Sequence, residues 1–267
     1  EIGVNYTNQI GSDFSYEIGA NFTQIKNEVI DMNGEVLISG PRITTEGAPI
    51  DSWYVLKTDG LFQTQEEVDN YPTITSRVGP GDVKYVDINE DGVINGDDRY
   101  IAGNTVPEFP YGFNFGVNFK GFSLSTMWQG VGNIYVRPNN NLASPFNNGA
   151  GLTKDWLTDS WTPENPNARL PRISARNQYT AENFSDSDFW LEDASYLRLK
   201  NIQLAYDFKG PLLERIGVNQ LRLFVNAQNI LTFTDVTMFD PERNITATNI
   251  DQYPSVKTTS VGVNLNF

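Results

Sequence analysis

The sequence contains neither histidine nor cysteine, and it has no long run of apolar residues. The absence of histidine excludes His-centred catalytic triads and most zinc and iron sites. The absence of cysteine suits an exported protein that needs no disulfides. No apolar run approaches the length of a membrane helix, which excludes a helical span. Alternating strands are not excluded, because they dilute the apolar signal and can leave a polar average.

Basic residues are also scarce. The chain has 19 Lys and Arg against 33 Asp and Glu, which gives a net charge of −14. This balance argues against nucleic acid or an anionic membrane surface as a partner. The length of 267 residues is sufficient for one or two domains with a core.

The last ten residues show the pattern that organises the chain. Apolar side chains fall on one face of an extended strand, and small polar ones fall on the other without any charge. The apolar set is Val261, Val263, Leu265 and Phe267, and the polar set is Ser260, Gly262, Asn264 and Asn266. The same alternation predicts further strands at residues 1–7, 14–23, 111–119, 122–129, 196–208 and from 221 onward. The sequence therefore predicts an all-β chain of about seven antiparallel strands.

The connections between these strands alternate between short and long. The long ones cover about residues 27–110, 131–195 and 232–257. In a transmembrane β-barrel, short turns are periplasmic and long loops are extracellular. With Phe267 at the periplasmic end, an aromatic girdle is expected there, formed by Tyr6, Phe14, Phe119, Phe122, Phe208 and Phe267. A soluble β-sandwich is the alternative, but it predicts neither the loop asymmetry nor the girdle.

The strand count is odd, whereas bacterial single-chain barrels have an even number. We therefore expect that this chain does not close a barrel alone and that the missing part precedes Glu1.

Residues 87–98 match the EF-hand type of calcium loop in most positions. The predicted metal ligands are Asp87, Asn89, Asp91, the carbonyl of Val93, Asn95 through water, and Asp98. Gly92 permits the sharp turn, and hard oxygen ligands suit Ca²⁺ better than Mg²⁺. An aspartate at position twelve, where glutamate is usual, predicts modest affinity. We expect the ion to stiffen the long loop of residues 27–110, which we expect to lack a core of its own. The alternative is an Asx-rich turn without a metal.

Other polar and aromatic residues give weaker signals. The paired carboxylates Glu66-Glu67 and Asp97-Asp98 are typical of solvated loops, so we assign no catalytic or cofactor-binding residue and expect no enzyme. Four tryptophans lie in loops and are expected to pack there, namely Trp53, Trp156, Trp161 and Trp190. Trp128 is expected to face lipid. Lumen-facing residues are expected to be Glu17, Asn21, Asn114, Asn118 and Gln129.

Segments spread over nearly the whole chain resemble the SusC family of TonB-dependent outer-membrane transporters. They are residues 47–50 with Trp53-Tyr54, 57–62, 81–85 leading into the calcium-type loop and Arg99, 111–114 with 120–122, 193–201, 226–231 and 263–267.

The resemblance implies the C-terminal section of a plugged barrel of about 22 strands in the outer membrane of a Gram-negative bacterium. It further implies import of oligosaccharides or oligopeptides, with a SusD-like surface lipoprotein over the extracellular mouth and energy from TonB. The N-terminal plug, the TonB contact and the earlier strands have no counterpart in this chain. The rest of the same barrel, outer-membrane lipid and the solute are the other expected partners.

Two other classes of protein remain as alternatives. A dockerin-like adhesion module would explain the calcium loop, although dockerins carry that loop twice and this sequence has one copy. A secreted β-sandwich glycan hydrolase would explain the tryptophans, and it would need a carboxylate pair about 5 to 9 Å apart in a cleft.

Overall fold

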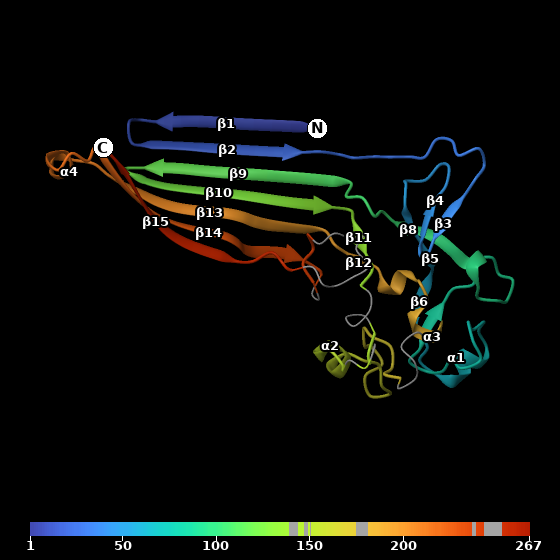
Figure 1. Cartoon of the computed structure of the whole chain (residues 1–267). Coiled ribbons are helices and arrows are strands. Elements are labelled where there is room, and N and C mark those ends of the chain that lie inside the picture. The colour runs from blue at the N-terminus through green and yellow to red at the C-terminus, as the bar shows by residue number, and fades with distance from the viewer. Residues whose placement is uncertain (139–143, 147–148, 150, 175–180, 237–238, 243–252) are drawn as a thin grey trace.

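A computed structural model describes residues 1–138, 144–146, 149, 151–174, 181–236, 239–242 and 253–267. The chain forms one long, curved antiparallel sheet, and a group of small elements lies at one end of it (Figure 1). We call this group, formed by the described parts of residues 24–108 and 133–195, the loop lobe. The short turns lie at the opposite end of the sheet, together with the C-terminus.

The large sheet has seven strands in the order β1-β2-β9-β10-β13-β14-β15. Their bounds are β1 Ile2–Ile10, β2 Phe14–Phe22, β9 Phe109–Phe119, β10 Phe122–Gly132, β13 Tyr196–Phe208, β14 Gln220–Thr234 and β15 Thr258–Asn266. Each neighbouring pair is antiparallel, as the alternating sequence pattern predicts. Within the described residues, β1 and β15 each have a single partner strand, so the sheet is open at both edges.

Short connections join strands at the turn end. Lys120 and Gly121 make the predicted tight hairpin between β9 and β10, both with positive φ, 47° and 88°. The helix α4 (Pro211–Arg215) lies in the connection between β13 and β14.

The first strand differs from its predicted bounds. We expected it to end at Thr7, but β1 continues to Ile10 and turns at Gly11, where φ is 68°. Tyr6 therefore lies in the middle of the strand, with its ring 5.9 Å from that of Tyr16, and not at the turn end with the other aromatic residues. The alternation is interrupted by polar Asn8, but the ladder with β2 continues past it because backbone pairing does not depend on the side chain.

The two faces of the sheet have opposite chemistry. One, the apolar face, carries Val4, Ile18, Phe115, Leu124, Leu204, Leu223 and Val263. The other, the polar face, carries Asn5, Glu17, Asn114, Ser125, Gln203, Arg222 and Asn264. Side chains of the apolar face are widely exposed, for example Val261 at 76% and Val4 at 61%. A continuous apolar surface of this kind is the sign of contact with lipid or with another protein, because water would disfavour it.

Lys200 is an extra residue within β13. In the ladder with β10 it is skipped, because Leu199 and Asn201 pair with consecutive residues of β10. The ladder with β14 shifts at the same place. Such a bulge changes which side chains point to each face of the sheet.

The bulge reverses the alternation of β13. On the turn side of Lys200, even-numbered residues such as Leu204 lie on the apolar face. On the lobe side, Leu197 and Leu199 take that face, and Arg198 turns to the polar face.

The loop lobe contains short strands and single helical turns. Its strands are β3 Leu37–Ser39, β4 Arg42–Thr44, β5 Ser52–Leu56, β6 Thr58–Leu61, β7 Val83–Tyr85, β8 Arg99–Gly103, β11 Tyr135–Val136 and β12 Glu192–Asp193. Its helical segments are α1 Gln65–Asp69, α2 Lys154–Thr158, α3 Ala181–Phe184 and the 3₁₀ turns Gly96–Asp98 and Asp188–Trp190. Every helix in the described ranges is too short and too polar to cross a bilayer.

The lobe has buried cores of its own, which the sequence analysis did not expect. One core joins Leu56, Val83, Tyr85 and Ile94, and a second joins Trp156, Leu170 and Trp190. The expectation that residues 27–110 lack a core was therefore wrong. Strands of three to five residues separated by Gly and Pro are too short to show a clear alternation, although together they bury a small apolar centre.

Candidate functional site

The predicted calcium loop, residues 87–98, is folded around its own side-chain oxygens. Asp87 accepts hydrogen bonds from the backbone N–H groups of Asp91 and Gly92, at 3.2 and 2.8 Å. Asn89 accepts from the N–H of Asp91 at 3.0 Å, and Asp91 accepts from that of Val93 at 2.8 Å. The bonds of Asn89 and Asp91 are Asx turns, and those of Asp87 close the loop over four and five residues. The hydrogen bonds therefore match the metal-free alternative as well as a calcium loop.

Asp98, the predicted last ligand, has a different role in this structure. Its carboxylate is fully buried and accepts from the backbone N–H groups of Ile88 and Asn95, each at 2.8 Å. Neighbouring Ile94 is 5% exposed and belongs to the core with Leu56. Within the described part of the chain, no three acidic side chains converge into a group that could hold a metal ion. The oxygen ligands fit calcium chemistry, and calcium binding stays a prediction.

An ion pair between a buried carboxylate and a partly exposed arginine joins the two long segments of the lobe. The carboxylate of Asp82, 1% exposed, receives two hydrogen bonds from the guanidinium of Arg172, at 2.7 and 2.6 Å. Asn183 donates to the same carboxylate at 2.9 Å, and so does the backbone N–H of Gly79. The oxygens of Asp82 are thus satisfied from parts of the chain about 100 residues apart, which fixes the lobe as one unit.

The loop tryptophans are packed as expected. Trp53, Trp156 and Trp190 are 3%, 1% and 7% exposed. The indole N–H of Trp53 donates to the carbonyl of Tyr135 at 2.8 Å. Trp161, which is half-buried, donates to the side chain of Gln63 at 3.0 Å.

A second charged cluster lies where the sheet meets the loop after β14. Arg198, 4% exposed, pairs with Asp240 at 2.7 Å and with Glu242 at 3.0 Å. Lys200 also contacts Glu242, at 2.9 Å. Burial would raise the pKa of Asp240, but hydrogen bonds from Arg198 and from two backbone N–H groups outweigh it and lower the pKa to about 2. The cluster therefore holds that connection to the sheet while Asp240 stays ionised.

The residues predicted to face the lumen share the polar face. Glu17, Asn21, Asn114, Asn118 and Gln129 all lie there by strand register. Glycines make room for some of them, since Gly116 lies against Glu17. On the same face, Gly262 of β15 lies against the ring of Phe224 of β14, where a Cβ would overlap the ring. Trp128 is on the apolar face, stacked on Phe113 at 5.4 Å.

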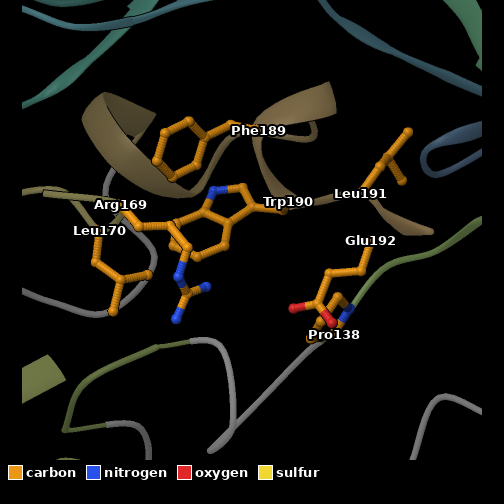
Figure 2. Close-up of a pocket in the computed structure, with 7 residues that line it drawn as sticks. All are labelled: Pro138, Arg169, Leu170, Phe189, Trp190, Leu191 and Glu192. Carbon is orange, nitrogen blue, oxygen red and sulfur yellow. The ribbon is translucent and has the colours of Figure 1, made fainter. Parts of the chain in front are cut away.

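The lobe also contains a cavity of about 240 Å³. Its lining is Pro138, Arg169, Leu170, Phe189, Trp190, Leu191 and Glu192. Figure 2 shows the charged ends of Arg169 and Glu192 extending to the same side of the Trp190 indole. The indole is fixed by a hydrogen bond from its N–H to the carbonyl of Asn183, at 2.7 Å.

Sequence reasoning missed the Asp82 pair, the Arg198 cluster and this cavity. The Asp82 pair and the cavity depend on contacts between distant segments, for which one sequence gives no signal. The Arg198 cluster did have a signal. Apolar residues occupy odd positions at Leu197 and Leu199 and even positions from Ile202 onward, and this change of phase marks a bulge.

Searches with the sequence found similar proteins, although no family model matches the chain. The chain is 29% identical over 290 residues to TonB-dependent receptor P3 of Formosa agariphila, covering 100% of the chain and 28% of that receptor. It is 22% identical to TonB-dependent receptor SusC of Bacteroides thetaiotaomicron, covering 100% of the chain and 26% of SusC. The chain thus spans less than a third of the length of these curated relatives.

A solved structure of the RagAB peptide transporter superposes with a TM-score of 0.74 at 23% identity, covering 99% of the chain and 28% of that structure's chain. The RagAB peptide importer in its closed-closed state gives 0.72 at 24% identity, covering 99% and 29%. The predicted fold class, a section of a transmembrane antiparallel β-barrel with long loops, is confirmed. The predicted resemblance to SusC-like TonB-dependent transporters is confirmed as well.

Proposed function

Because this chain corresponds over its whole length to a section of the SusC-like TonB-dependent receptors, we propose that it forms part of an outer-membrane importer. The observation that carries the proposal is the seven-stranded sheet with one exposed apolar face and one polar face. Such a sheet suits a barrel wall between lipid and a wet lumen.

The rival classes fit this sheet less well. A soluble sandwich would cover its apolar face with a second sheet. Here the other sheets of the described residues have only two to four strands, and the apolar residues of β1 and β15 are exposed. The relatives are named as receptors and transporters, which fits a role without catalysis.

We further infer how the parts of the chain act. The lobe would be extracellular, where it meets a SusD-like lipoprotein lid, and the polar face would line the path of the solute. The remainder of the barrel, with a plug and a contact to TonB, would be supplied outside these 267 residues. The solute would be an oligosaccharide or an oligopeptide, and the similarity to the RagAB peptide transporter favours the peptide.

Calcium in loop 87–98 belongs to the same proposal. Asp87, Asn89, Asp91, Val93, Asn95 and Asp98 would hold it as a structural ion. Its effect would be to secure the position of a loop whose Ile94 already anchors it to the lobe core.

Peptide-mapping mass spectrometry of the detergent-extracted native complex tests the proposal. We expect peptides from a plug, from further strands and from a surface lipoprotein to accompany this chain. An energy-dependent uptake assay in cells with and without the transporter tests import. The isolation of this chain alone, soluble without detergent, would contradict the proposal.

A further inference from the structure

The cavity beside Trp190 has the size and lining of a site for one side chain. Its volume of about 240 Å³ is below the range of about 300–1,000 Å³ that is typical for whole small-molecule ligands. Leu170 and Trp190, both buried, form apolar walls. Two charged residues, Arg169 and Glu192, contribute to the lining. A ligand group that fits here has an apolar stem and a charged end.

Arg169 is already engaged with two acids outside the cavity. Its guanidinium contacts Asp155 and Asp159, each at 3.4 Å. Its backbone N–H also donates to Asp159, at 3.2 Å. The guanidinium is thus paired with the carboxylates of Asp155 and Asp159. Glu192 lines the same cavity, so three carboxylates and one guanidinium lie in or beside it.

Glu192 lacks a hydrogen-bond donor for one of its oxygens. Within the described part of the chain, its Oε2 atom is buried and accepts no hydrogen bond. Burial raises the pKa of Glu192, and the nearby charge of Arg169 only partly opposes this. The backbone of Glu192 is fixed in the ladder with Val136, which places the residue in the lining of the cavity. A buried carboxylate oxygen without a donor is the atom that a ligand cation would satisfy.

We propose that this cavity binds the side chain of a lysine residue in a peptide, with its ammonium group on the carboxylate of Glu192. The inference deepens the proposed import function and rests on it, because the importer would bring peptides to this lobe. The methylene stem of lysine matches the walls formed by Leu170 and Trp190, and its ammonium supplies the missing donor. An anionic ligand is disfavoured by the three carboxylates.

The test measures peptide binding to the whole transporter complex purified in detergent. Isothermal titration compares Ala-Lys-Ala with Ala-norleucine-Ala, which has a side chain of similar length without the charge. We expect the lysine peptide to bind about tenfold more tightly. Glu192→Gln should abolish this preference, whereas Glu164→Gln, the same change at an exposed position of the lobe, should retain it.

Glu192→Asp, which keeps the charge but draws it back, serves as a second variant and should retain part of the preference. The wild-type comparison needs no variant, so a folding defect does not remove the test. Equal binding of the two peptides, or an unchanged preference in Glu192→Gln, would overturn the inference. Glu192-dependent binding of maltotriose without a lysine preference would overturn it in favour of a sugar site. If cells still took up peptide when one of these results was obtained, the proposed import function would be unaffected and only the lysine site would be excluded.

Discussion

The large sheet and the loop lobe are stabilised in different ways. In the sheet, strands of nine to fifteen residues form long antiparallel ladders, and the apolar side chains lie exposed on one face. In the lobe, strands of two to five residues enclose small cores, and buried polar contacts such as Asp82 with Arg172 join distant segments. Regular backbone pairing thus holds the wall, while individual side chains hold the lobe. Single substitutions should therefore affect the lobe most strongly.

The largest effect is expected for Asp82→Ala. It removes the buried carboxylate that accepts hydrogen bonds from Arg172 and Asn183. The loss of these bonds should destabilise the lobe by about 3 kcal/mol. Thermolysin should cleave the lobe of the variant transporter faster. The transporter should still migrate as a folded barrel on a semi-native gel, because the sheet is unaffected. Asp59→Ala is the control, since Asp59 is 67% exposed in its pair with Lys84, and such pairs contribute about 0–1 kcal/mol. Equal effects of the two variants would show that the Asp82 pair has no special role.

Arg198→Ala should have the next largest effect, this time where the sheet meets the loop after β14. The guanidinium of Arg198 is 4% exposed, and its removal leaves Asp240 and Glu242 without their shared partner. Because Lys200 still pairs with Glu242, the cost should be about 2 kcal/mol, measured as the temperature at which the transporter loses its folded band on a semi-native gel.

Lys200→Ala is the matched control for that substitution. It removes only the contact with Glu242 and keeps the two ion pairs of Arg198, so a small effect is expected. An Arg198→Ala variant as mild as Lys200→Ala would show that the buried guanidinium does not stabilise this junction.

A smaller effect is expected for Gly262→Ala. The added methyl group would overlap the ring of Phe224 on the polar face and force that ring to move, at a cost of about 1–2 kcal/mol. Gly3→Ala in β1 is the control, because a Cβ there meets no atom within 4 Å. The effect of each variant is measured as the temperature at which the transporter loses its folded band on a semi-native gel. If both variants lowered this temperature equally, the cause would be the replacement of glycine in a strand and not the packing against Phe224.

Calcium should give the smallest effect, because the lobe has its own cores. At a calcium concentration equal to the dissociation constant, binding stabilises the folded form of loop 87–98 by about 0.4 kcal/mol. Thermolysin should then cleave this loop about twofold more slowly. The double variant Asp87→Ala with Asp91→Ala should lose this response, and Asp97→Ala, at an exposed position outside the ligand pattern, should keep it. Identical cleavage with calcium and with chelator would favour the metal-free Asx turns.

The strands of the sheet could be predicted from the sequence because each one shows the alternation over most of its length, although in β1 Asn8 interrupts it and hid the last three residues of the strand. The lobe could not, because its strands are short and its contacts join Asp82 to residues 90 and 101 positions away. The spacing of residues 87–98 predicts calcium ligands, and this stays a prediction; that the carboxylate of Asp98 accepts from the backbone N–H of Ile88 depends on the folded lobe and could not be predicted. The cavity at Glu192 has no local motif, since its walls come from separate segments.

The bulge at Lys200 has a practical consequence for protein engineering. Odd-numbered residues of β13 lie on the apolar face on the lobe side of Lys200 and on the polar face on its turn side. An epitope grafted onto every second residue across this position would therefore be divided between the two surfaces of the sheet. A designer who places a binding epitope on β13 has to change from odd to even positions at Lys200 to keep all grafted side chains on one surface.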